Sequence, residues 1–128
     1  MNDDRRARIG QRGEELARAY LLAHGYAIVS QRWRPAPPLR GDIDIVARQG
    51  AEIVFIEVRT RSAHADGVDG AYGSIGPRKQ AQLVRLAYAY ASEHDLPDSL
   101  WRIDGVAVAY DPVTGETTID HTENLLDW

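Results

Sequence analysis

The chain has 128 residues, no cysteine, an apolar fraction of 44% and a net charge of −4. This length suits one domain with a single core, and the apolar fraction is too high for a disordered chain. The lack of cysteine excludes a disulfide framework and a thiolate metal site, and no apolar run is as long as a membrane span. We therefore expect a single domain over residues 1–128, without a signal segment or membrane contact, in the cytoplasm.

The charges are unevenly distributed along the chain. Residues 1–90 contain 14 basic and 10 acidic residues, a net charge of +4, whereas residues 91–128 contain one base and nine acids, a net charge of −8. Fourteen of the 15 basic residues are arginines, whose planar fork suits phosphate oxygens. This asymmetry is typical of an interaction surface. Taken alone, a solvated surface with a bias towards arginine explains it more simply.

The first part of the chain predicts one helix followed by three strands. Apolar periodicity and turn residues place these elements at residues 9–23, 26–29, 42–47 and 52–60. Gly25 is a stop signal for the helix, and the prolines of residues 34–38 exclude regular structure there. The last two strands read as a hairpin that turns at Gln49-Gly50.

A long glycine-rich loop over residues 62–76 divides this part from the rest of the chain, and such loops are often functional. A second helix opens at Gly76-Pro77, with proline in its favoured first position, and runs to about residue 94. Strands follow at residues 101–110 and 116–121. The order αβββαββ predicts an α/β fold, a three-layer-like sandwich with a mixed sheet of about five strands between two main helices.

The hairpin strands carry acids at positions where buried strands are normally apolar. A turn at Gln49-Gly50 pairs positions that sum to 99, so that Asp44 faces Phe55. Because side chains alternate between faces, we expect one face to carry Asp42, Asp44, Glu57 and Arg59 and the other to carry Ile43, Ile45, Val54, Ile56 and Val58. Asp44 and Glu57 become diagonal neighbours, roughly 7 Å apart at their backbones.

Carboxylates this close to each other require a cation or a proton between them. Oxygen ligands without histidine or cysteine indicate a hard cation, Mg²⁺ or Mn²⁺, which activates water and stabilises charge on a phosphate. Alternatively, Arg40, Arg59 and Arg61 neutralise the acids in a structural ion-pair network. The spacing alone leaves both interpretations open.

Two helical residues point towards the same patch. Glu14 lies on the edge of the inner stripe of the first helix and could join the outer shell of the ion, or it could pair with Arg18 one turn on. Lys79 lies on the sheet-facing stripe of the second helix, where it could reach the site, or its stem could simply cover apolar surface. The four histidines show no metal-ligand spacing, and we expect most of them at the surface.

The spacing of Gly41-Asp42-Ile43-Asp44 and Phe55-Ile56-Glu57-Val58-Arg59 resembles the PD-(D/E)XK nuclease superfamily. The whole chain resembles the YraN-type family of small bacterial proteins, uncharacterised protein family 0102, itself similar to archaeal Holliday-junction resolvases. The residues that carry this resemblance extend over most of the chain: Gly13-Glu14, Ala17, Tyr20-Leu21, Gly25-Tyr26, Arg32, the segments 41–47 and 55–61, Ile75, Lys79, Leu83 and Ile103-Asp104.

The resemblance implies a restriction-endonuclease-like core with Asp44 and Glu57 as metal ligands, the Val58 carbonyl as a third ligand, and Glu14 as an extra acid. The lysine of the superfamily falls on Arg59 in this chain. Because an arginine stays protonated, Arg59 could hold a phosphate but could not act as a base. Lys79 would then supply the missing amine, as relocated lysines do in some relatives, or catalysis is weak or lost.

The resemblance further implies a metal-dependent endonuclease acting on DNA with a branched or non-duplex structure, with a homodimer as one way to cut two strands. We expect Arg32, Arg40, Arg61 and Arg78 to contact the nucleic acid. Two alternatives remain: a nucleic-acid-binding module without catalysis, and a protein-interaction subunit whose acidic end meets a basic partner.

Overall fold

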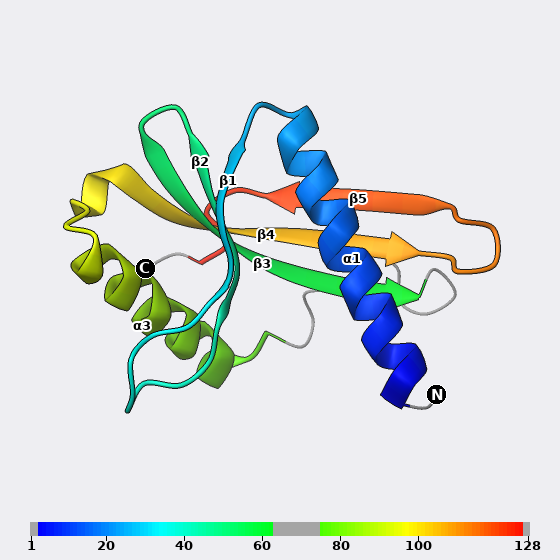
Figure 1. The fold of residues 1–128 in the computed structure, drawn as a ribbon, viewed down its shortest axis with the longest axis horizontal. Helices are drawn as coiled ribbons and strands as arrows, with labels where there is room; N and C mark the ends of the chain where they lie inside the picture. The colour runs from blue at the N-terminus through cyan, green and yellow to red at the C-terminus, as the bar shows by residue number, and fades with distance from the viewer. Residues whose placement is uncertain (1–2, 63–74, 127–128) are drawn as a thin grey trace.

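The computed structural model describes residues 3–62 and 75–126, and these residues form an α/β fold (Figure 1). Its elements are α1 (Asp3–Ala23), β1 (Ala27–Trp33), β2 (Ile43–Gln49), β3 (Glu52–Ser62), α3 (Pro77–Glu93), the 3₁₀ helix η1 (Asp98–Leu100), β4 (Trp101–Tyr110) and β5 (Thr117–Thr122). The predicted fold class is confirmed, and so is the predicted order of elements. In the part of the chain that is described, no helix is long and apolar enough to cross a membrane.

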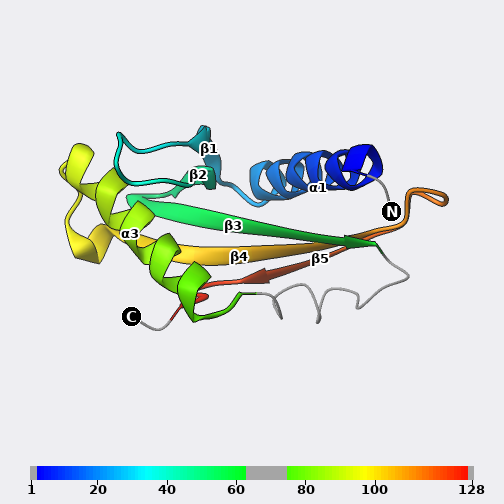
Figure 2. The ribbon, with the colours of Figure 1, turned by 90° about the horizontal axis from the view of Figure 1, so that it is seen from below.

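The five described strands form one mixed sheet in the order β1-β2-β3-β4-β5. All neighbours are antiparallel except β3 and β4, which are parallel and pair over ten residues. A parallel pair needs a crossover connection, and α3 lies in the connection between these two strands. Figure 2 shows α1 on one face of the sheet and α3 on the other, which gives the three layers.

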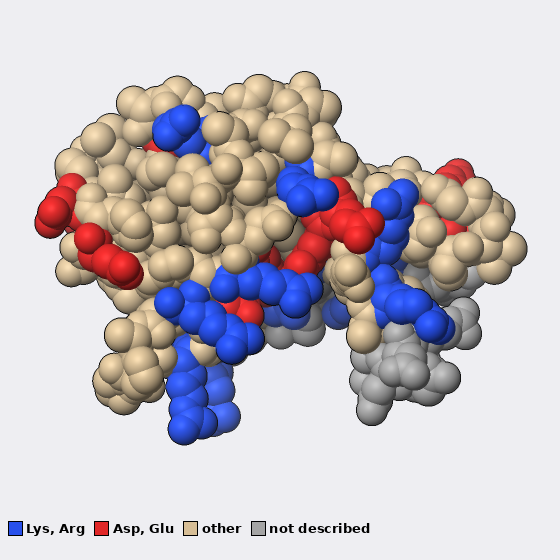
Figure 3. Space-filling view, in the orientation of Figure 1, with Lys and Arg blue, Asp and Glu red and all other residues tan. Residues whose placement is uncertain are grey.

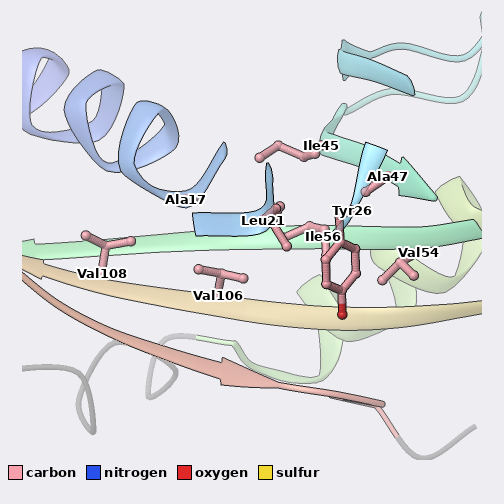
Figure 4. Close-up of a cluster of buried hydrophobic side chains, with 9 residues drawn as sticks. All are labelled: Ala17, Leu21, Tyr26, Ile45, Ala47, Val54, Ile56, Val106 and Val108. Atoms are coloured by element: carbon pink, nitrogen blue, oxygen red, sulfur yellow. The ribbon is translucent and has the colours of Figure 1, made fainter. Parts of the chain in front are cut away.

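The core on the α1 side of the sheet is aliphatic. Ala17 and Leu21 of α1 are completely buried, and the labelled side chains of Figure 4 fill the space between this helix and the strands. The sheet supplies alternate residues of its strands: Ile45, Ala47, Val54, Ile56, Val106 and Val108. Burying each of the larger side chains contributes about 1.5–3 kcal/mol, so this face anchors α1 firmly.

The core on the α3 side is aromatic. Phe55 lies 5.3 Å from the rings of both Tyr90 and Trp101, in edge-to-face arrangements. Leu86 and Ala87 of α3 complete the cluster and are fully buried. Aromatic pairs of this geometry add about 0.5–1.5 kcal/mol beyond their buried area. This packing fixes the axis of α3 against β3, the strand that carries Glu57.

The predicted register of the β2–β3 hairpin is wrong by two residues. Gln49 pairs with Glu52 and Val46 with Phe55, so paired positions sum to 101 and the turn is formed by Gly50-Ala51. Gly50 has φ +61, the positive value that glycine adopts readily at the first position of a two-residue hairpin loop. A shift of two residues keeps every side chain on its predicted face, because side chains alternate with period two.

One side chain departs from the predicted faces. Ile45, Val54 and Ile56 pack on the α1 side as expected, but Ile43 belongs to the cluster on the α3 side. At this end of β2 the pairing is with β1 alone: Ile43 pairs with Trp33, and both side chains pack in the cluster on the α3 side. Of the loop predicted over residues 62–76, residues 63–74 lie outside the described part of the chain.

Candidate active site

Asp44 and Glu57 lie at the point where the β2–β3 ladder ends. The last backbone pair joins Ile45 and Ile56, and the same register continued by one residue places Asp44 opposite Glu57. The two acids are therefore direct cross-strand neighbours, rather than the diagonal neighbours that the predicted register made them. Beyond the ladder, the backbone N–H of Val58 donates to Asp44 Oδ2 at 2.8 Å. This bond ties the side chain of one strand to the backbone of the next.

The backbone that leads into Asp44 is held by close packing against α3. Gly41 has φ +109, and a Cβ there would lie 2.5 Å from Gln82 Nε2 and 3.3 Å from Leu86 Cδ1. Gln82 Nε2 also donates to the carbonyl of Arg40 at 3.2 Å. The dihedral angle favours glycine at position 41, and a side chain there would displace the end of the Gln82 side chain. This contact sets where the acidic strand begins.

Both carboxyl groups have raised pKa values. Burial, followed by the charge of Glu57, raises the pKa of Asp44 from 3.8 to about 7. Burial is also the largest cause of the raised pKa of Glu57, which is only 4% exposed. The charge of Asp42 raises the pKa of both groups, so this third acid lies close to them. The site therefore carries more negative charge than its own surroundings neutralise.

Two cations approach Glu57 from different elements. Arg59 Nη2 lies 3.4 Å and Lys79 Nζ 3.8 Å from the same atom, Glu57 Oε1. Both charges lower the pKa of Glu57, but burial outweighs them. Arg59 Nε is buried and has no hydrogen-bond partner among the described residues. A buried donor without an acceptor is costly unless a ligand supplies one, so Arg59 is suited to an anionic ligand.

Glu14 reaches the site because α1 approaches β3 closely. A Cβ on Gly13 would lie 1.9 Å from Thr60 Oγ1, so only glycine allows this approach. Glu14 accepts two hydrogen bonds from Arg32, at 2.9 and 3.1 Å, and its charge raises the pKa of Asp44. The expected alternative, a pair with Arg18, is not what the structure contains. Arg32 has φ +51, a strained value for arginine that is typical of functional sites.

The donor set of the site suits a hard divalent cation. Asp44 and Glu57 each use one carboxylate oxygen for their contacts with described residues, Oδ2 and Oε1. Their other oxygens, together with a backbone carbonyl and water, match the ligands that Mg²⁺ and Mn²⁺ prefer. No group of three histidine, cysteine or acidic side chains among the described residues could hold a metal. Magnesium sites with few carboxylates retain several waters, so two carboxylates are a sufficient protein contribution.

The structure brings most of the predicted site residues together, but not all of them. Asp44, Glu57, Val58, Arg59 and Lys79 form one group, and Glu14 with Arg32 borders it. Val58 contributes its N–H to this group, and its carbonyl as a metal ligand stays a prediction. The other predicted contacts are not part of this group: Arg40 and Arg78 line a neighbouring cavity, and Arg61 donates to the carbonyl of Thr60.

Sequence reasoning missed Gln82, whose amide holds the segment before Asp42. The only signal was its place four residues after Arg78, on the same face of the helix. It also missed a second charged cluster, on the other face of the sheet. Arg102 Nε donates to Asp104 Oδ1 at 2.9 Å, and His121 Nε2 lies 2.8 Å from Asp104 Oδ2. His24 and His94 are exposed as expected, whereas His121 has a side chain only 9% exposed.

Figure 3 shows how charge is distributed over one face of the molecule. Acidic side chains gather at a hollow in the middle of this face, and lysine and arginine side chains lie on both sides of them. An acidic centre with a basic periphery is the charge pattern expected of a site for a phosphate ester with a metal ion.

Comparison with known proteins gives consistent relatives. The profile of Uncharacterised protein family UPF0102 matches residues 13–108. A UPF0102 protein of Roseiflexus castenholzii is 42% identical over 118 residues, 91% of each chain. A UPF0102 protein of Chloroflexus aurantiacus is 48% identical over 103 residues, 79% of this chain and 78% of the relative. One of Moorella thermoacetica is 47% identical over 106 residues, 83% of this chain and 84% of the relative. The span matched by the profile includes the two acids Asp44 and Glu57 and the two cations beside them, Arg59 and Lys79.

Proposed function

The chain belongs to Uncharacterised protein family UPF0102, and we propose that it is a metal-dependent nuclease that hydrolyses phosphodiesters of DNA. The observation that carries this proposal is the pair of buried carboxyl groups, Asp44 and Glu57, with raised pKa values beside two cations. Carboxylates kept unneutralised in a fold are costly, and a bound divalent cation removes that cost. The resemblance to PD-(D/E)XK nucleases supports the same chemistry.

In this proposal Asp44 and Glu57 hold Mg²⁺ or Mn²⁺, with the Val58 carbonyl as a further ligand. When bound, the ion supplies a positive charge for a phosphate oxygen and lowers the pKa of water. The Val58 N–H orients Asp44 by occupying Oδ2, so that Oδ1 is presented to the ion. Glu14 contributes negative charge from α1 and is itself oriented by Arg32.

The two cations have different roles because their chemistry differs. Arg59 stays protonated, and its guanidinium group, 3.4 Å from Glu57, holds a phosphate oxygen as a permanent donor. Lys79 Nζ, 3.8 Å from Glu57, is the amine of the site and delivers a proton towards the leaving oxygen. Arginine at position 59 is then compatible with catalysis, because the amine comes from α3 instead of from β3.

The substrate in this proposal is DNA with a branched or non-duplex structure, cut by one copy or by a homodimer. The test incubates the protein with labelled four-way junctions, flaps, single strands and duplexes, in Mg²⁺ or Mn²⁺ at pH 8. We expect metal-dependent cleavage of the branched or single-stranded substrates. Asp44→Asn and Glu57→Gln should each lower the rate about 10³-fold or more, a loss of about 4 kcal/mol in transition-state stabilisation.

The matched control is Asp120→Asn, which removes an exposed acid on β5 and should leave the rate unchanged. Lys79→Ala should lower the rate while preserving binding of the DNA, because Lys79 acts in the chemical step. Cleavage that persists in both Asp44→Asn and Glu57→Gln would contradict the assignment of the site. Binding of DNA without cleavage of any substrate in either metal would instead leave a nucleic-acid-binding module.

A further inference from the structure

A cavity of about 300 Å³ lies between α3 and the segment that precedes β2. It is lined by Pro38, Leu39, Arg40, Arg78, Gln82 and Arg85, and we call these residues the arginine pocket. Among the described residues, this lining has three guanidinium groups and no acid. Like charges around one cavity repel each other, so the pocket is suited to an anion.

A hydrogen bond joins the two walls of the arginine pocket and fixes their spacing. Arg78, Gln82 and Arg85 occupy positions i, i+4 and i+7 of α3, which fall on one face of the helix. The third arginine comes from the opposite wall, where Gln82 Nε2 donates to the carbonyl of Arg40 at 3.2 Å. The same glutamine packs against Gly41. The spacing of the three guanidinium groups therefore depends on the contact that also positions the strand of Asp44.

The three arginines of the pocket have no partner for their side chains among the described residues. The side chains of Arg40, Arg78 and Arg85 form no ion pair or hydrogen bond with any other residue that the structure describes, and all three are exposed. By contrast, Arg12, Arg32 and Arg102 each pair with an acid.

Each wall of the arginine pocket is continuous in the chain with residues of the candidate active site. Arg40 precedes Asp42 by two residues, and Arg78 is next to Lys79, whose ammonium lies 3.8 Å from Glu57. An anion in the pocket would thus lie beside the proposed cleavage site. Arg78 and Arg85 are separated by two helical turns, about 10 Å along the axis, so they can contact successive charges of an extended chain.

We propose that the arginine pocket binds the phosphodiesters next to the scissile one, on the same nucleic-acid strand, with Arg40, Arg78 and Arg85 as the phosphate contacts. This inference rests on the proposed nuclease function and adds the path of the strand, along α3 and away from Lys79. The apolar wall of Pro38 and Leu39 offers a surface for the sugars, which a chain of carboxylates would not use. A nucleic acid is therefore favoured over an acidic peptide.

The first experiment measures binding of a labelled single-stranded oligonucleotide in EDTA, so that no metal-dependent cleavage interferes. The triple variant Arg40→Gln/Arg78→Gln/Arg85→Gln should bind about tenfold more weakly or worse at 100 mM salt. The slope of log affinity against log salt should become shallower by about 2, since each phosphate contact on a single strand contributes about 0.7. The matched control is Arg8→Gln/Arg12→Gln/Arg48→Gln, which removes the same charge elsewhere and should leave the slope unchanged.

The second experiment locates the contact by placing single uncharged methylphosphonates at successive positions of a cleavable strand. In the parent protein, one neutral linkage next to the scissile phosphate should slow cleavage. In the triple variant the same linkage should have no further effect, because both changes remove one interaction. Circular dichroism and thermal melting are measured alongside to check that the triple variant is folded.

Three results would overturn the inference. Equal affinity and salt slope in the triple variant and its control would show that the pocket is not on the strand path. Additive effects of the neutral linkage and the triple variant would place the contact elsewhere. Competition by polyglutamate as strong as that by the oligonucleotide would assign the pocket to an acidic protein partner. Failure of the parent to cleave, with the pocket effects on binding intact, would refute only the nuclease function.

Discussion

Two buried acids on neighbouring strands of this protein have opposite surroundings. Glu57 on β3 pairs with Gly105 of β4, and the residue before it, Ile56, pairs with Asp104. The two acids therefore lie close in the sheet but point to opposite faces. Glu57 is 4% exposed and has a raised pKa, whereas Asp104 is completely buried and has a lowered pKa.

The partners of the two acids explain the difference. Burial raises the pKa of Asp104, but hydrogen bonds from His121, Arg102 and the backbone N–H of Asn124 outweigh it. We call this group the Asp104 network. Glu57 has two more distant cations and, among the described residues, no backbone donor. Burial alone thus does not mark a functional acid. A better marker of a functional acid is one that is buried and insufficiently neutralised, because the protein does not itself compensate the free-energy cost of burying its charge.

The largest contrast is expected from removing the satisfied acid. Asp104→Ala should lower the free energy of unfolding by about 3–5 kcal/mol, because Arg102 and His121 lose the charge they surround. Urea denaturation at pH 7 measures this. Glu116→Ala, at an exposed position in the turn before β5, should change stability by less than about 0.5 kcal/mol. A loss below 1 kcal/mol for Asp104→Ala would show that the network does not depend on this acid.

Removing Asp44, the acid opposite Glu57 whose pKa is also raised by burial, should have the opposite sign. The pKa of Asp44 is raised to about 7 in the folded chain, so between pH 4 and 7 the folded state binds more protons than the unfolded state. Stability from this group therefore falls as pH rises through that window. Asp44→Asn should be more stable than the parent at pH 8 by up to about 4 kcal/mol, and little changed at pH 4. A variant destabilised equally at both pH values would contradict this.

A divalent metal should stabilise the folded protein by binding at Asp44 and Glu57, and not at the Asp104 network on the other face of the sheet. At a concentration one hundred times its dissociation constant, Mn²⁺ should add about 2.7 kcal/mol to the stability of the parent at pH 8. The gain should shrink below pH 7, where protons compete for Asp44. Thermal melting with and without Mn²⁺ measures it. Asp44→Asn should lose the gain, and an equal gain in that variant would place the ion elsewhere.

A smaller effect is expected at Gly41, the glycine that precedes the strand of Asp44 and packs against α3. Gly41→Ala should cost about 1–2 kcal/mol for its φ of +109, together with the displacement of Gln82. Gly115→Ala is the matched control, since Gly115 has φ +77 and no atom of the described residues lies within 4 Å of its Cβ position. Both variants should lose stability, but only Gly41→Ala should also lower cleavage. Equal cleavage by the two would show that the Gly41 contact does not position the acids.

The smallest effect is expected at the exposed rim of the site. Arg32 pairs with Glu14 at 2.9 Å, with a side chain 59% exposed. Such pairs contribute about 0.2–1 kcal/mol. A double-mutant cycle of Arg32→Ala and Glu14→Ala, followed by urea denaturation, measures the coupling between the two side chains. A coupling above 2 kcal/mol would make this rim pair comparable with the Asp104 network, and would remove the distinction between them.

The candidate site was predictable from sequence to the extent that its geometry is local. The predicted hairpin register was wrong by two residues, yet Asp44 and Glu57 remained neighbours on one face because a shift of two preserves the alternation. Lys79 was placed by helical periodicity. The pairing of Glu14 with Arg32 was not predictable, since it joins α1 to β1 across 18 residues through a tertiary contact.

The sequence by itself determined the order of helices and strands, their buried faces and the acids that the hairpin brings together. These follow from periodicity and turn chemistry, which act over a few residues. Only the tertiary structure decided which buried acid is satisfied. His121 reaches Asp104 from β5, whereas Glu57 receives Lys79 from α3 at a longer distance. The burial of an acid and the partners that neutralise it come from elements remote in the chain. The sequence therefore located the acids, and the packing decided which of them is neutralised.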